Sequence, residues 1–103
     1  MSARVLQINL KFEGPGADLK KGFAQVVNDI AAVPGLIWKI WIMNEQTHEA
    51  GGLYLFNSQE AVDAYLGGPL IAALKTNPAL GQFSFKQFDV LEDLTAITRG
   101  PVK

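Results

Sequence analysis

His48 and Glu49 are the first residues of this 103-residue sequence whose types suggest acid–base chemistry. Histidine titrates near neutral pH and a carboxylate can orient its ring, so such a pair could accept and return a proton. Adjacent side chains on an extended chain point to opposite sides, however, so the two need not act together. The plainer interpretation of His48 is an exposed loop histidine or one that bonds to the backbone.

Phenols and amides are the next candidates. A buried phenol seeks a hydrogen-bond partner that a ligand could supply, and this applies to Tyr54 and Tyr65. Either ring could instead pack in the core. Gln7 and Asn9 fall in the middle of a predicted strand, away from its apolar side, where they could hold a carbonyl or a phenol. Hydrogen bonds across the strands or to water would satisfy them as well.

Two tryptophans and a lysine lie close together in a second predicted strand. Trp38 and Trp41 have opposite parity, so they cannot line the same wall of a pocket. We expect one of them in the core and the other against a cavity or a partner subunit. Lys39 shares a face with Trp41 and could pair with a substrate anion, or its amine could extend past the sheet edge to water.

The composition excludes several classes of site and partner. The sequence has no Cys and one His, which excludes disulfides, thiol nucleophiles and metal sites built from thiolates or several histidines. A net charge of −1 argues against nucleic acid or an anionic membrane as the main partner. No apolar run is long enough for a signal peptide or a membrane span. We therefore expect a cytoplasmic protein whose residues 1–103 form one domain.

The periodicity of apolar residues predicts the elements that position these groups. Period-two patterns predict strands at residues 4–12, 36–43, 51–56 and 82–91. Helical spacing predicts helices at residues 18–33, 61–66, 70–75 and 92–99, the second behind a capping box at 57–60. The last strand is predicted to bulge near Lys86 and Gln87, and the last helix to turn Leu94 and Ile97 inward. The order β-α-β-β-α-β is typical of the ferredoxin-like α+β fold, an antiparallel sheet with its helices on one face.

The second and third strands carry apolar side chains on both faces. Two helices cover only one face of a four-stranded sheet, so a second apolar face would be larger than monomers usually expose. A homodimer that packs sheet against sheet about a two-fold axis would cover it. That packing could leave an aromatic-lined cavity for a small aromatic or apolar molecule.

Two segments resemble a known family, the YdhR-like monooxygenases. They are Pro-Gly-Leu-Ile-Trp-Lys-Ile-Trp at 34–41 and His-Glu-Ala-Gly-Gly-Leu-Tyr-Leu-Phe at 48–56. The first strand with its Gly14-Pro15 end and the segment 88–90 fit the same family. The resemblance implies a dimeric α+β barrel related to the antibiotic-biosynthesis monooxygenases. Those enzymes oxidise electron-rich aromatic polyketides with O₂ and use no metal, heme or flavin.

The resemblance also implies a dry aromatic pocket with a proton acceptor and hydrogen bonds to a developing anion. In this sequence the catalytic roles would fall to His48 as base, Asn9 and Tyr54. Five residues would bind the substrate: Trp38, Trp41, Lys39, Phe56 and Tyr65. The chain departs from the related monooxygenases, which often have an acidic residue at the position of Tyr54 and a histidine at that of Tyr65.

Two functions remain open at this point. One is a cofactor-independent monooxygenase acting on a small phenolic or quinonoid compound, and the other is a non-catalytic dimer that binds a ligand in the same cavity. A third, isomerase or heme-handling activity, is less favoured, because His48 is the one imidazole available as an axial ligand. Oxygen consumption with hydroquinones and anthrones would separate the first two.

Overall fold

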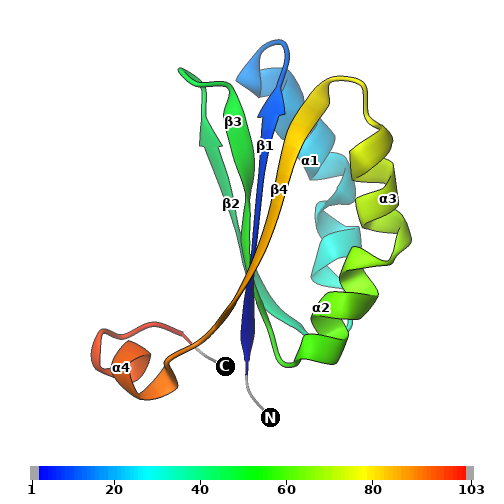
Figure 1. Cartoon of the computed structure of the whole chain (residues 1–103). Helices are drawn as coiled ribbons and strands as arrows, with labels where there is room; N and C mark the ends of the chain where they lie inside the picture. Colours follow the sequence, from blue (N-terminus) through cyan, green and yellow to red (C-terminus); the bar gives the residue numbers. More distant parts are fainter. Residues whose placement is uncertain (1–2, 102–103) are drawn as a thin grey trace.

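A four-stranded antiparallel sheet carries helices on one of its faces in the computed structural model, which describes residues 3–101 (Figure 1). The sheet order is β2-β3-β1-β4, so the first strand is central, as the ferredoxin-like prediction requires. The elements in chain order are β1 (Arg4–Phe12), α1 (Gly16–Ala31), β2 (Leu36–Asn44), β3 (Glu49–Phe56), α2 (Gln59–Leu66), α3 (Pro69–Thr76), β4 (Leu80–Asp89) and α4 (Glu92–Ile97). No helix among residues 3–101 has both the length and the apolar character needed to cross a membrane.

Capping residues and proline explain where the helices begin. The N-cap of α2 is Ser58, whose side chain accepts a hydrogen bond from the Ala61 N–H at 3.2 Å. The sequence predicted a capping box that starts one residue earlier, at Asn57. Pro69 opens α3, where its fixed φ and missing N–H cost nothing. Helix α1 starts at Gly16, two residues before the predicted start, and Asp18 lies in its first turn without capping it.

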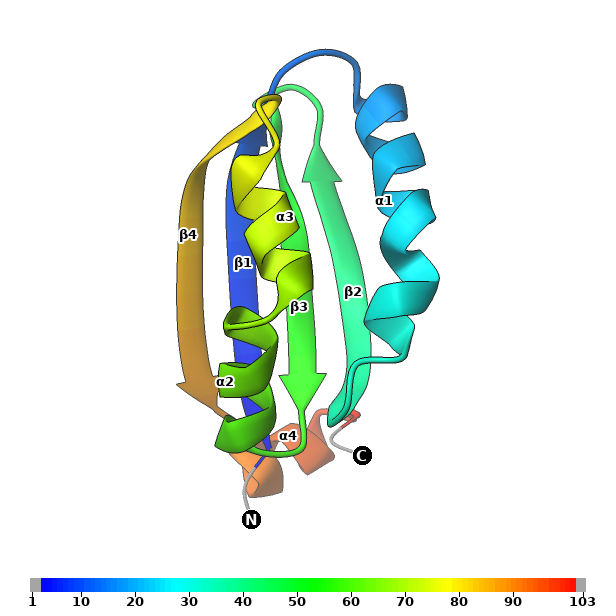
Figure 2. The same ribbon diagram turned by 90° about the vertical axis from the view of Figure 1, so that its right-hand side faces the viewer.

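The core lies between the sheet and α1–α3. Alternate residues of β1 point to the helices, and the β1–β3 register places Tyr54 opposite Leu6 on that same side. The other side of the sheet, here called the open face, has no helix of α1–α3 on it (Figures 1 and 2). The fully buried large side chains of this core are Leu6, Ile8, Phe56, Val62 and Ile71, and Leu55 is fully buried on the opposite face of the sheet.

Strand β4 has its bulge at a different place from the predicted one. The register with β1 shifts between Asn9 and Lys11, opposite Gln82, whose φ is 49°. Around Lys86 the pairing is regular, so the prediction of a bulge there is wrong. The physical reason is that simple alternation already sends Phe88 to the open face, and no extra residue is required.

Strand β2 has a bulge that the alternation pattern did not predict. Leu36 pairs with Phe56 and Trp38 with Leu55, so Ile37 is the extra residue. Leu36 therefore packs on the helix side together with Trp41, whereas strict alternation grouped Leu36 with Trp38.

Helix α4 lies beyond the end of the sheet, on the side opposite α1–α3 (Figure 1). Residues 90–101, here called the C-terminal arm, return to the sheet where the Trp38 indole N–H donates to the Pro101 carbonyl oxygen at 3.0 Å. Leu94 and Ile97 are 59% and 75% exposed, so the prediction that they face inward is wrong, because no element of the described chain covers that side of the helix. The projecting arm accounts for a radius of gyration of 14.1 Å, against about 13 Å for a compact chain of this length.

Candidate functional site

Helix α1 lies apart from α2 and α3 over the same face of the sheet (Figure 2). The residues between them line a cleft. Two cavities form it, of about 290 and 460 Å³, and both are lined by Tyr65 and Leu70. We call the smaller one, which contains Lys39 and Trp41, the inner cavity, and the larger one the outer cavity. Cavities of this size, largely apolar with few polar groups, are typical of small-molecule sites.

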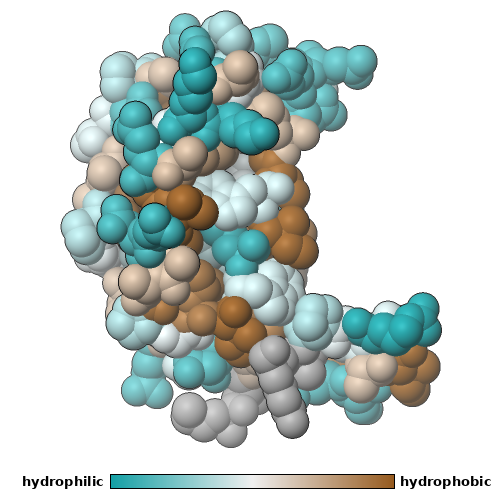
Figure 3. All heavy atoms as spheres, turned by 180° about the vertical axis from the view of Figure 1, so that it is seen from behind, coloured by the Kyte–Doolittle hydropathy of each residue, from teal (hydrophilic) through white to brown (hydrophobic). Residues whose placement is uncertain are grey.

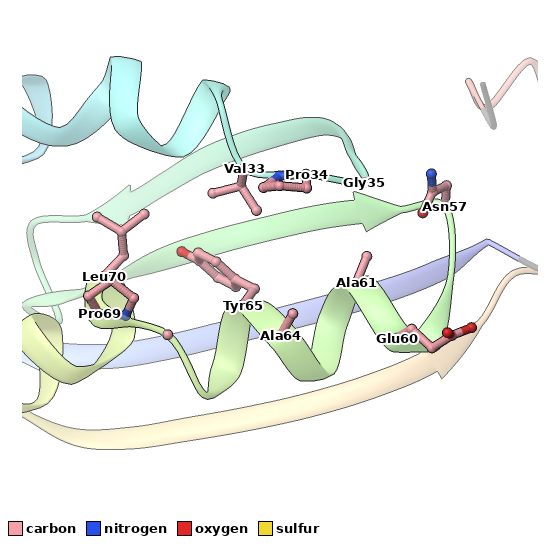
Figure 4. Close-up of a pocket in the computed structure, with 11 residues that line it drawn as sticks. Val33, Pro34, Gly35, Asn57, Glu60, Ala61, Ala64, Tyr65, Pro69 and Leu70 are labelled. Carbon is pink, nitrogen blue, oxygen red and sulfur yellow. The ribbon is translucent and has the colours of Figure 1, made fainter.

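The outer cavity lies between the start of β2 and α2 (Figure 4). Pro34 and Gly35 form one wall, and Ala61 and Ala64 of α2 form the other. Tyr65 points from α2 toward the gap between them (Figure 4). Small side chains on α2 leave room here for an apolar molecule, and Tyr65 lines both this cavity and the inner one.

Two phenols face each other in the inner cavity. The hydroxyl oxygens of Tyr54 and Tyr65 lie 3.0 Å apart in a buried hydrogen bond, and the ring centroids are 5.2 Å apart. Burial raises the pKa of both hydroxyl groups, so both stay protonated at neutral pH. The pair has two O–H hydrogens and uses one between its members, so the other can be donated to an oxygen of a bound molecule.

Lys39 lies beside this pair with its amine over aromatic faces. Its Nζ is 3.4 Å from the ring centroid of Trp41 and 4.5 Å from that of Tyr54. Apart from Lys39 and the two tyrosines, the side chains that line the inner cavity are not titratable. Burial lowers the pKa of Lys39 from 10.5 to about 7, while the aromatic faces favour its charged form.

Gly51 and Gly52 make this arrangement possible. A Cβ at Gly52 would lie 2.5 Å from Cε of Lys39, so the missing side chain opens the slot in which the lysine lies. A Cβ at Gly51 would collide with the backbone carbonyl of Ile8 in the neighbouring strand. The two glycines of the His-Glu-Ala-Gly-Gly segment are thus close-packing residues, one toward β1 and one toward Lys39.

The structure brings four of the predicted site residues together in the inner cavity: Lys39, Trp41, Tyr54 and Tyr65. Phe56 lies behind them, fully buried and stacked on Tyr54 with a centroid distance of 6.0 Å, so it supports the phenols without lining the cavity. Sequence reasoning missed Phe23 of α1, whose ring centroid is 5.0 Å from that of Trp41. The helical spacing of Leu19, Phe23 and Val26 was the available signal.

Three predicted site residues lie elsewhere. His48 is exposed in the turn between β2 and β3, with φ 54° and its ring 5.1 Å from that of Phe12. Asn9 and Trp38 are on the open face, because their parity is opposite to that of the cavity residues on the same strands. None of the three lines the inner cavity, and their catalytic or binding roles stay predictions.

Within residues 3–101, His, Asp and Glu side chains form no group of three or more that could hold a metal ion. Neither Arg4 nor Asp89, which form an ion pair, lines either of the two cavities. The inner cavity can offer mainly apolar walls, phenol hydrogen-bond donors and one amine whose pKa is lowered to about 7, and the outer cavity adds the carboxylate of Glu60.

Comparison with models of known protein families identifies the family of this chain. Residues 5–101 match the model of the family described as "Putative mono-oxygenase ydhR", and the chain belongs to this family. The resemblance inferred from the sequence is thereby confirmed. No curated protein matches the chain.

Solved structures share the fold. NE2512, a protein of unknown function from Nitrosomonas europaea, has a TM-score of 0.72 and 23% identity, over 88% of this chain and 91% of that one. SnoaB, a cofactor-independent oxygenase from Streptomyces nogalater, has a TM-score of 0.71 and 14% identity, over 87% of this chain and 94% of that one. MhuD, a heme-degrader from Mycobacterium tuberculosis with two hemes bound in its active site, has a TM-score of 0.66 and 27% identity, over 84% of this chain and 95% of that one.

Proposed function

We propose that this protein is a cofactor-independent monooxygenase that oxidises a small electron-rich aromatic compound with O₂ in the inner cavity. The observation that carries the proposal is the buried Tyr54–Tyr65 pair beside Lys39 and Trp41 in a cavity with mainly apolar walls. Family membership supports it, and SnoaB is a cofactor-independent oxygenase of similar fold.

The reaction needs a substrate that forms a stabilised anion, such as an anthrone. Loss of a proton gives a carbanion, which passes one electron to O₂, and the carbon radical and superoxide then combine. The proton returns to the peroxide, which loses water and leaves a carbonyl. The CH₂ group thus loses two hydrogens and gains one oxygen atom, and the second oxygen atom leaves in water. A phenol O–H of the tyrosine pair would stabilise the anion, and the apolar walls would exclude water.

The proposal includes a homodimer formed through the open faces. Ile40 of β2 and Phe88 of β4 are about half exposed there, and the C-terminal arm adds exposed Leu91, Leu94 and Ile97. The arm projects from the body and carries hydrophobic surface (Figure 3). A second copy would cover both surfaces at once. The cytoplasmic location expected from the sequence belongs to this proposal, and fractionation of cells that express the tagged chain tests it.

Oxygen uptake with a panel of anthrones and hydroquinones tests the activity. We expect uptake well above the protein-free rate, and Tyr54→Phe should lower it by about 100-fold if that phenol stabilises the anion. The variants His48→Ala and Asn9→Ala test the roles predicted for those residues. Binding of the compounds with uptake no faster than without protein would support the non-catalytic alternative.

Heme is a separate control because MhuD degrades it. In this chain the one histidine lies in the exposed turn and does not line either cavity of the cleft. A heme bound in the cleft would then lack an imidazole ligand from the same chain. A hemin titration that gives tight binding with a His48-dependent spectrum would contradict the proposed substrate class.

A further inference from the structure

We propose that Lys39 is the proton acceptor of the inner cavity and the charge partner of the anion that results. The site therefore selects substrates with an acidic hydroxyl, namely phenols and enols. This inference rests on the proposed function for its catalytic meaning, but the binding chemistry can be tested without oxygen.

The position of Lys39 is the first argument. Its Nζ lies over the Trp41 and Tyr54 rings inside the cavity, and its stem occupies the slot that Gly52 leaves open. A lysine that merely extended to water would not need a glycine beneath its Cε. A bound aromatic hydroxyl in this cavity would therefore meet both the amine and the tyrosine pair.

The surroundings of Lys39 are the second argument. The cavity-lining side chains of α1, α3 and β4 are uncharged, β3 contributes Tyr54 and α2 contributes Tyr65. No carboxylate faces the amine within this lining, so no built-in counter-ion holds the lysine charged. An anionic ligand would supply the missing charge.

Lys39 and the two tyrosines differ in which of them can accept a proton. Burial lowers the pKa of Lys39 to about 7, so both the amine and the ammonium are accessible at neutral pH. The pKa values of Tyr54 and Tyr65 are raised, so these phenols donate hydrogen bonds and do not accept the proton. The amine of Lys39 is the titratable group of this cavity suited to taking it.

The step is a proton transfer. The substrate O–H bond breaks, its electron pair stays on the substrate oxygen, and the lone pair of Nζ forms the new N–H bond. A neutral phenol and a neutral amine become a phenolate and an ammonium, so no proton enters or leaves the solution. Methyl ethers of the same phenols have no proton to give and should bind weakly.

Binding of 4-cyanophenol under argon tests this step, because its phenolate absorbs at longer wavelength than the phenol and its pKa lies above the value of about 7 for Lys39. One pH unit below the pKa of the free probe, about a tenth of it is ionised. On the wild-type protein we expect more than half of the bound probe to be phenolate, a roughly fivefold rise. Lys39→Met should abolish the rise. Lys75→Met should retain it and is the matched control, because this lysine also lies over an aromatic ring, Phe85, but outside the inner cavity.

Gly52→Ala is a second test that leaves the lysine in place. The new methyl group should displace the amine and lower the phenolate signal, while circular dichroism reports whether each variant is folded. A wild-type protein that leaves the probe neutral or unbound would overturn the proposal. So would a phenolate signal that survives Lys39→Met or that disappears in His48→Gln.

Oxygen uptake separates this inference from the proposed function. A phenolate signal that depends on Lys39, without uptake for any substrate, supports the Lys39 site and overturns the monooxygenase. Uptake that is unchanged in Lys39→Met supports the monooxygenase and overturns the role of Lys39.

Discussion

The hydroxyl oxygens of Tyr54 and Tyr65 lie 3.0 Å apart, one on strand β3 and the other on helix α2, and their hydrogen bond joins the two layers of the fold at the floor of the cleft. The pair is both structural and chemical, because a buried phenol needs a partner and a pair of phenols retains one hydrogen to donate. Its two roles can be separated by measurement.

Tyr54→Phe and Tyr65→Phe should each lower the free energy of unfolding by about 1–2 kcal/mol, because each leaves the other buried hydroxyl without its partner. The double variant should cost less than the sum of the single ones. Urea unfolding of the four proteins measures this coupling. Strictly additive losses would show that the hydrogen bond contributes nothing to stability.

Lys39→Met should flatten the pH dependence of stability. In the folded protein the pKa of Lys39 is lowered to about 7, so between about pH 7 and its unfolded value of 10.5 the unfolded chain binds more protons. The free energy of unfolding should therefore rise with pH over this window, and Lys39 should cost stability below it. Urea unfolding at several pH values between about 6 and 9.5 compares the slopes, with Lys75→Met as control. Equal slopes in all three proteins would contradict the lowered pKa.

The affinity for a simple phenol should be level between two pKa values and should fall on the acid side of the lower one. Between the pKa of Lys39, about 7, and the ordinary phenol value near 10, the ion pair forms without net proton exchange, so affinity should be constant. Below about pH 7 a proton must be released to form it, and affinity should fall about tenfold per pH unit. Calorimetric titrations in buffers of different ionisation enthalpy measure both the affinity and the released protons. An affinity that stays level down to about pH 5 would argue that the phenol binds neutral.

Gly51→Ala should destabilise the protein more than Gly52→Ala. The methyl group at Gly51 meets the rigid backbone of Ile8, whereas at Gly52 it meets the flexible end of Lys39. Gly81→Ala is the matched strand control, since no atom lies within 4 Å of its Cβ position. Thermal unfolding ranks the three variants, and a Gly51→Ala protein as stable as the control would rule out the close approach of β1 and β3.

Phe88→Glu should prevent self-association, because it places a carboxylate on the half-exposed apolar surface of the open face that we propose as the subunit interface. Sedimentation velocity at micromolar concentration should show a dimer for the wild type and a monomer for the variant. Val27→Glu is the control, an exposed apolar residue of α1 on the helix side. A wild-type monomer would remove the dimer from the proposed function.

Much of the architecture follows from local patterns. The bounds of β1 were predicted from strict alternation, and the opposite parity of Trp38 and Trp41 correctly separated the two indoles. Alternation alone cannot say which of two apolar faces meets the helices, so the choice of Trp41 for the cavity needed the tertiary structure. His48 is exposed in the turn, as the plainer interpretation of the sequence predicted, but no spacing rule indicates its left-handed φ of 54°.

The C-terminal arm is a second place where the sequence pattern did not predict the packing. Leu94 and Ile97 have the spacing of a buried helix face, yet they lie outside the body of the molecule. Apolar periodicity predicts that a face will be covered, but it does not identify the covering group as the same chain or as another one.

The extra residue Ile37 at the start of β2 decides the chemistry of the cleft. Leu36 is packed in the core. The number of paired residues that follow it therefore decides which face of the sheet each later side chain of β2 lies on. If Ile37 were paired in the ladder and not bulged out, the parity would shift by one and exchange Lys39 and Trp41 for Trp38 and Ile40, which would remove the amine from the floor of the cleft. Deleting Ile37 would remove the bulge and leave Lys39 and Trp41 in place. Homologous chains that have the same number of residues here but pair them without a bulge would then have different reactivity although their overall shape is the same.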